Sequence, residues 1–149
     1  MRSTLILALT LLLTACSKDN SERYKEIIND TMECSYDAGW SVNTLGDAIV
    51  GTYEWRYVRA YGFGEWEYSS DSDFKNWTLE LKADSTFILN QADSATVQGQ
   101  WSLSNSWLSF MLDCQPPAST LWGEVLYCEP YLVFYSSPVD GPDHLYERQ

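Results

Sequence analysis

Residues 78–87, TLELKADSTF, carry the clearest signal of fold class in this chain. Leu79 and Leu81 alternate with polar residues, which is the pattern of a strand with one buried face and one wet face. Ala-Asp-Ser then interrupts the alternation. Aspartate and serine favour tight turns because their side chains bond to nearby backbone groups. The stretch therefore predicts a β-hairpin whose second strand carries Phe87.

The same two-residue period recurs from residue 48 to the end of the sequence. Its longest further runs are residues 51–57 and 97–103. Shorter runs of the same kind lie at 86–91, 107–112, 123–129, 131–136 and 143–148. Short strands separated by turn residues predict an antiparallel all-β barrel or sandwich. The sequence has no βαβ pattern, which excludes dinucleotide-binding folds of the parallel type.

The residues that precede the strands show another pattern. The polar residues 17–20 are typical of a tether. Apolar residues at three- and four-residue spacing, Ile27 and Ile28 among them, predict one short helix over residues 21–33 that covers or braces the domain. Residues 34–46 contain two glycines and are expected to form a loop.

The N-terminus indicates where the protein is located. Residues 13–16 read LTAC and close a segment with a basic start at Arg2 and an apolar core over residues 5–13. A secretory signal has this shape. Small residues before a cysteine at the cut site resemble the lipobox of bacterial lipoproteins. The resemblance implies that residues 1–15 are removed and that Cys16 is lipidated.

This resemblance also predicts the anchor and the compartment. The apolar run is shorter than the roughly 20 residues that span a bilayer, whereas two or more acyl chains such as palmitate hold a protein at a membrane. The expected partner is thus a membrane, reached through the lipid. Ser17 is not the aspartate that retains lipoproteins at the inner membrane, so we expect the Gram-negative outer membrane, on its periplasmic face or at the cell surface.

Charge and size narrow the other partners. The 149 residues include 9 basic and 21 acidic side chains and carry a net charge of −12. So acidic a chain repels phosphate backbones, which argues against nucleic acid as a partner. The length suits one folded domain, which we expect to be a monomer.

Three cysteines remain after Cys16. An exported compartment permits disulfides. Cys114 and Cys128 flank a loop that contains proline and glycine, so a bridge between them is our preferred prediction, with a stabilisation of about 3 kcal/mol for a loop of roughly 15 residues. Pairing of Cys34 with either of them is the alternative, because sequence does not determine connectivity.

Short motifs along residues 48–148 resemble the small lipocalin-like domains of Gram-negative lipoproteins. They are Gly51-Thr52-Tyr53, the hairpin at 78–87, Gly99-Gln100-Trp101-Ser102-Leu103 and the closing Tyr146-Glu147-Arg148. The resemblance implies an up-and-down barrel of about eight strands over residues 48–149, preceded by a lipidated tether and one short helix over residues 16–47. Tyr53 stands where that family has tryptophan, and Ser85 where it has glycine.

The resemblance also implies a role for Arg148. On the last strand this residue would lie over the aromatic ring of Tyr53 or Trp55 and close the end of the barrel. Such a cation–π contact contributes about 0.5–2 kcal/mol. The implied role is structural.

No catalytic pattern is visible in the sequence. It contains no Gly-x-Ser-x-Gly elbow and no Ser-x-x-Lys. His144, the sole histidine, is expected on a surface loop, and without further histidines or a Cys-x-x-Cys pair a zinc site is not expected. We therefore predict that the protein is not an enzyme and has no cofactor and no metal site.

Aromatic residues are the main candidates for binding. Seven tryptophans and ten tyrosines are present. Those that the alternation points inward are Tyr53, Trp55, Tyr57, Trp77 and Trp101. They either fill the core or line a cavity for a small apolar or glycan-like ligand. Trp66, Trp107 and Trp122 are expected at the surface, where tryptophans stack on sugars or seat a protein partner. Non-catalytic ligand binding is the main hypothesis, and a protein-interaction module with a filled barrel is the alternative.

Overall fold

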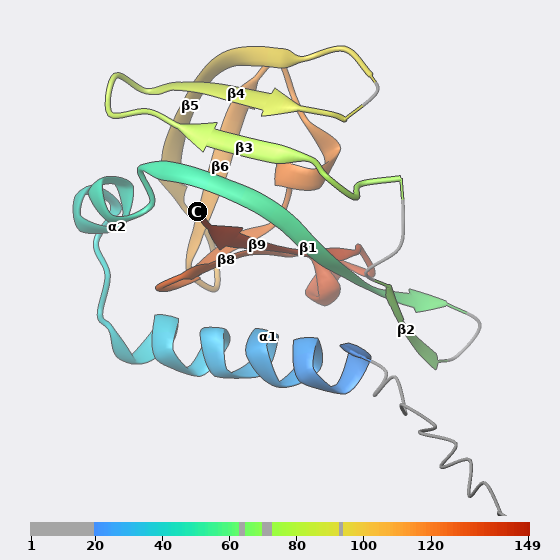
Figure 1. Ribbon diagram of the computed structural model, residues 1–149. Coiled ribbons are helices and arrows are strands. Elements are labelled where there is room, and N and C mark those ends of the chain that lie inside the picture. Colours follow the sequence, from blue (N-terminus) through green and yellow to red (C-terminus); the bar gives the residue numbers. More distant parts are fainter. Residues whose placement is uncertain (1–19, 63–64, 70–72, 93) are drawn as a thin grey trace, which may run out of the picture.

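A computed structural model describes residues 20–62, 65–69, 73–92 and 94–149, and the signal segment with Cys16 lies outside these ranges. Within them, helices α1 (Asn20–Asp37) and α2 (Val42–Ala48) precede the strands (Figure 1). The strands are β1 (Gly51–Gly62), β2 (Glu65–Ser69), β3 (Thr78–Leu81), β4 (Thr86–Asn90), β5 (Val97–Asn105), β6 (Phe110–Gln115), β7 (Glu124–Cys128), β8 (Tyr131–Tyr135) and β9 (Asp143–Arg148). Short 3-10 helices lie at Ser119–Leu121 and Ser137–Val139.

Eight of these strands form a closed antiparallel barrel. From β3 to β9 each strand pairs with the next one in the sequence, and β1 pairs with both β3 and β9. Strand β2 lies outside the ring and pairs with the far half of β1, which projects beyond the barrel (Figure 1). The prediction of an all-β, up-and-down barrel of about eight strands is therefore confirmed.

Helix α1 exists where a helix was predicted, but it is longer than residues 21–33. It runs across the outer face of the strands β7, β8, β9 and β1 (Figure 1). Ile28 is fully buried there, and the ring of Tyr24 stacks on Tyr57 with 4.6 Å between centroids. The outer-face side chains beneath the helix are Tyr57, Leu126, Val133 and Leu145. The interface between α1 and the outer face of the barrel is thus a second, smaller hydrophobic core.

Helix α2 was not predicted, because most of its residues fall in the expected loop over residues 34–46. Ser41 caps it, since the Ser41 hydroxyl accepts from the amide of Thr44 at 3.2 Å and the Thr44 hydroxyl accepts from the amide of Ser41 at 2.9 Å. Leu45 anchors the helix in the barrel core. A helix of seven residues that includes a glycine has a weak local signal, so burial of Leu45 is what stabilises it.

A bulge in β1 divides its aromatic side chains between the two cores. Trp55 pairs with Tyr146 and Tyr57 pairs with Leu145, which leaves Arg56 as an extra residue. An extra residue in one strand moves the side chains that follow it to the other face. The expectation that Tyr57 points into the barrel is therefore wrong: its ring lies outside, against α1.

Candidate functional site

Large side chains fill the barrel interior. Tyr53, Phe87, Phe134 and Tyr146 are fully buried there, and the rings of Phe134 and Tyr146 meet edge to face at 5.7 Å. Rings of this size occupy much of the interior of a small barrel.

Four of the five aromatic residues expected to face inward belong to this core. Tyr53, Trp55 and Trp101 are buried in it, and Trp77 packs against it half-buried. The indole Nε1 of Trp55 donates to His144 Nδ1 at 3.2 Å, and that of Trp101 donates to the carbonyl of Thr86 at 3.0 Å. The indole N–H groups of Trp55 and Trp101 thus already have partners within the protein.

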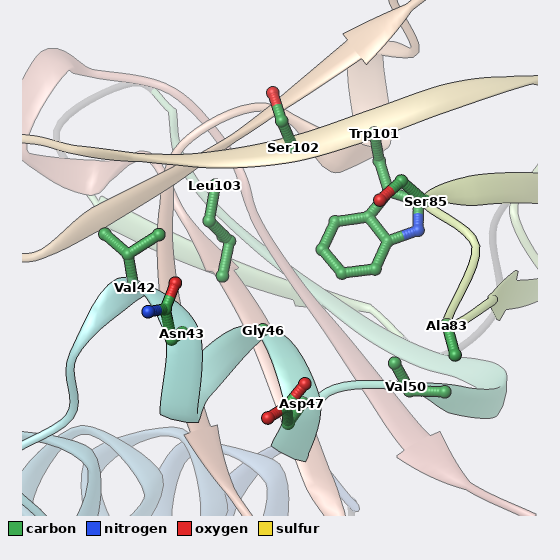
Figure 2. A pocket seen from close by; sticks show the side chains of 10 residues that line it. All are labelled: Val42, Asn43, Gly46, Asp47, Val50, Ala83, Ser85, Trp101, Ser102 and Leu103. Carbon is green, nitrogen blue, oxygen red and sulfur yellow. The ribbon is translucent and has the colours of Figure 1, made fainter.

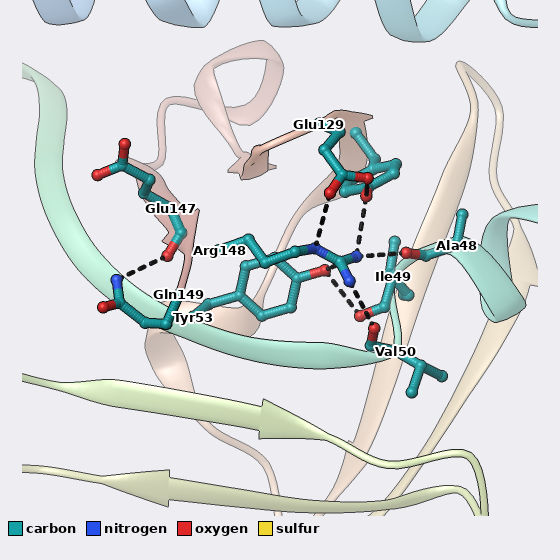
Figure 3. Close-up of polar contacts among 9 residues, drawn as sticks. Ala48, Ile49, Val50, Tyr53, Glu129, Glu147, Arg148 and Gln149 are labelled. Atoms are coloured by element: carbon teal, nitrogen blue, oxygen red, sulfur yellow. Dashed lines mark hydrogen bonds and ion pairs between the residues drawn. The ribbon is translucent and has the colours of Figure 1, made fainter.

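Arg148 closes one end of the barrel, as the resemblance implied (Figure 3). Its guanidinium carbon lies 5.2 Å from the ring centroid of Tyr53 and 5.6 Å from that of Tyr127. Its N–H groups donate to the carbonyls of Ala48 and Val50 and to both tyrosine hydroxyls. One side chain therefore ties the end of α2 to β1, β7 and β9.

His144 lies inside the barrel, so its expected position on a surface loop is wrong. It is 2% exposed, on β9, with its ring edge-to-face against Phe74 at 4.9 Å. Burial lowers the pKa of His144 to about 4. The imidazole is thus neutral at physiological pH, and because Nδ1 accepts from Trp55, its proton is on Nε2.

The neighbouring Asp143 points to the other face of the barrel wall. Its carboxylate accepts from Arg59 Nε at 2.7 Å and from the backbone amides of Ser136 and Ser137 at 2.7 and 2.8 Å. A carboxylate held in this way is fully buried and stabilised by charge-assisted bonds. Asp143 and His144 therefore do not form an acid–base pair.

The predicted bridge between Cys114 and Cys128 is wrong, because Cys128 pairs with Cys34. The Cα atoms of the bonded pair are 5.9 Å apart. Cys114 points into the barrel core, whereas Cys128 lies on the outer face beside α1, so the wall of the barrel separates them. Burial, with the charge of Asp113, raises the pKa of the Cys114 thiol to about 12.

A surface groove of about 580 Å³ lies between α2 and β5 (Figure 2). Asn43 and Asp47 of α2 contribute polar side chains and Leu103 of β5 an apolar one, whereas the Ser102 side chain points away from α2 (Figure 2). Trp101 forms part of its wall but is only 8% exposed. The groove thus offers hydrogen-bonding groups without an open aromatic platform.

A second site lies at the β5–β6 hairpin and the start of β7. Trp107 and Trp122 are 77% and 50% exposed, in agreement with the prediction for both, and the exposed Val139 lies with them. We call these three residues the apolar patch. They line a pocket of about 80 Å³ together with Glu124, which is 5% exposed. The side chain of Trp66 lies outside the described part.

Among the described residues, no group of three or more histidine, cysteine or acidic side chains is placed to hold a metal ion. No described helix is long and apolar enough to span a membrane. No protein-family profile, no curated protein and no solved structure matches the chain.

Proposed function

We propose that this chain is an exported, lipid-anchored protein whose barrel is a non-catalytic interaction module. The observation that carries this proposal is the contrast between the filled interior and the exposed apolar patch of Trp107, Trp122 and Val139. Exposed tryptophans at a small pocket are typical of binding surfaces. The barrel then serves as a rigid scaffold for this surface and does not enclose an apolar ligand.

Location at the Gram-negative outer membrane rests on the lipobox at Cys16. A disulfide between Cys34 and Cys128 is consistent with an oxidising compartment. Residues 17–20 span at most about 14 Å between the anchor and α1, so the lipid would hold the domain close to the bilayer. Replacement of Cys16 with alanine should release the protein from membranes, and retention would refute the anchor.

The non-catalytic role draws support from the surroundings of the titratable groups. His144 is enclosed by Trp55 and Phe74, and Asp143 is saturated by Arg59 and backbone amides. General acid–base catalysis needs such a group within reach of a substrate proton. The lipocalin-like assignment remains part of the proposal and rests on the motifs of β1, β3, β4, β5 and β9.

Titration with N-phenyl-1-naphthylamine, which fluoresces in apolar cavities, distinguishes a barrel that only supports a binding surface from a barrel that carries an apolar ligand inside. The full chain should give no saturable one-to-one signal. Phe134→Ala should gain one, because removal of a fully buried ring leaves an apolar cavity that accepts small aromatic molecules. Saturable binding to the unmodified chain would favour ligand carriage and refute the scaffold.

The groove between α2 and β5 favours a second candidate, binding of a glycan. Asn43 and Asp47 present amide and carboxylate groups along one open surface (Figure 2). Sugar hydroxyls are both donors and acceptors and suit such a set. Asp47→Asn should weaken oligosaccharide binding at least tenfold if this candidate holds, while Asp37→Asn, on the exposed end of α1, should leave it unchanged.

A further inference from the structure

Glu124 is a buried carboxylate at the edge of the apolar patch. It begins β7, where it pairs with Met111 of β6 and Tyr135 of β8. Its side chain lines the pocket of about 80 Å³ and is 5% exposed. A charge in such a position is normally paired, because desolvation is costly.

Only half of this carboxylate has a partner in the protein. The hydroxyl of Ser106 donates to Oε1. Oε2 is buried and has no hydrogen-bond partner. Of the nine basic residues, all except Arg2 and Lys18 lie in the described ranges, and no ion pair to Glu124 forms within those ranges. A cation that binds to the pocket would supply the compensating positive charge.

Aromatic rings surround the same pocket. Trp107 and Trp122 are exposed on its rim, and Tyr135 is part of its lining. The faces of tryptophan and tyrosine rings attract cations, and tryptophan does so most strongly. Carboxylate and rings thus favour the same kind of ligand, a cation with an apolar stem.

We propose that this pocket binds the ammonium group of a lysine side chain from a partner protein. The proposal rests on the interaction-module function above and names the chemistry of the partner. The volume of about 80 Å³ is far below the 300–1,000 Å³ of ordinary small-molecule sites, so the pocket suits one side-chain head group. The net charge of −12 attracts basic partners at long range.

The single unpartnered oxygen discriminates lysine from arginine. Guanidinium groups bind carboxylates best through two parallel bonds, one to each oxygen. Ser106 already donates to Oε1 of Glu124, so Oε2 is the oxygen that lacks a partner. An ammonium group is a compact point charge and is satisfied by that arrangement.

The test compares N-acetyl-lysine-N-methylamide with its norleucine counterpart, which has an apolar side chain of similar length without the charge. The full chain in detergent is titrated, and the indole N–H signals of Trp107 and Trp122 are followed by NMR. The lysine compound should shift both signals saturably, with at least tenfold tighter binding than norleucine. The arginine compound should bind more weakly than lysine.

Variants of the pocket supply the controls. Glu124→Gln keeps the shape of the side chain and should weaken lysine binding at least tenfold, and Trp107→Ala, at a 77% exposed position, should weaken it without affecting folding. Glu33→Gln makes the same charge change at an exposed site on α1 and should have no effect.

Equal binding of lysine and norleucine, unchanged binding by Glu124→Gln, or tighter binding of arginine would each overturn the proposal. Such a result, combined with a negative naphthylamine titration, would leave the interaction module itself intact. A positive naphthylamine titration would refute the module whatever the lysine result, so the two failures are distinguishable.

Discussion

Simultaneous replacement of Cys34 and Cys128 with alanine should remove a large part of the stability of the fold. The disulfide joins α1 to the end of β7 across 94 residues of sequence. A cross-link that closes a loop of this length restricts the unfolded chain by about 4–5 kcal/mol at 25 °C. The free energy of unfolding should fall by about that amount. Since small domains have only about 5–15 kcal/mol in total, the variant would be marginally stable.

Urea unfolding of the full chain measures this effect, and reduction supplies an internal control. Dithiothreitol should lower the midpoint of the unmodified protein and leave that of the double variant unchanged. Helix α1 should still dock in the variant, because Ile28 keeps its contacts with the outer face of the barrel. A loss below about 2 kcal/mol would contradict the entropic argument.

The chemistry of the remaining thiol tests the same pairing. Burial raises the pKa of Cys114 to about 12, so iodoacetamide at pH 8 should leave it unmodified until denaturant is added. Peptide mapping without reduction should find Cys34 joined to Cys128. A bridge that contains Cys114 would refute the assignment.

Three further perturbations have defined outcomes. Because the pKa of His144 is about 4 in the fold and about 6.5 in the unfolded chain, the unfolded state binds the proton first. Stability should therefore fall by about 3 kcal/mol from pH 7 to pH 4, and His144→Gln should lack this part of the slope in urea titrations at each pH. Arg148→Lys should lower the free energy of unfolding by about 2–4 kcal/mol, because one ammonium cannot replace a guanidinium that binds four acceptors. A loss below about 1 kcal/mol would argue against barrel closure by this residue. Gly99→Ala places Cβ 1.9 Å from the carbonyl oxygen of Gln115 and should lower the free energy of unfolding by about 3 kcal/mol or more. Gly46→Ala has its nearest neighbouring atom at 3.8 Å and should instead stabilise α2 by about 0.5–1 kcal/mol. Equal melting temperatures for these two glycine variants would contradict that contrast.

Features of the chain that depend on local pattern could be predicted. Alternation at Leu79 and Leu81 gives a strand in any context where one face is buried. Repetition of that pattern predicts an antiparallel barrel or sandwich, and the motif resemblance implies the barrel. The helix over residues 21–33 follows from its apolar spacing in the same way, although its end at Asp37 does not. The resemblance implied that Arg148 lies over the ring of Tyr53 or Trp55, and in the structure it lies over that of Tyr53.

Whether a side chain lies on the inner or the outer face of the barrel wall could be determined only from the folded structure. One extra residue at Arg56 moves Tyr57 from the interior to the surface beneath α1, and no local signal marks that bulge. The sequence likewise does not show on which side of the barrel wall Cys114 lies. Cys114 is near Cys128 in the sequence, but the barrel wall separates the two side chains.

Glu124 shows this limit most clearly. In an acidic chain a carboxylate within a strand is typically a solvated surface group, and nothing in its neighbours along the sequence marks it as buried. Its environment comes from Ser106, Met111 and Tyr135, which strand pairing and the chain turns bring together. Periodicity along the chain therefore predicts the strands, and the resemblance of the motifs implies the barrel, whereas burial, pairing and charge compensation arise from contacts between distant segments.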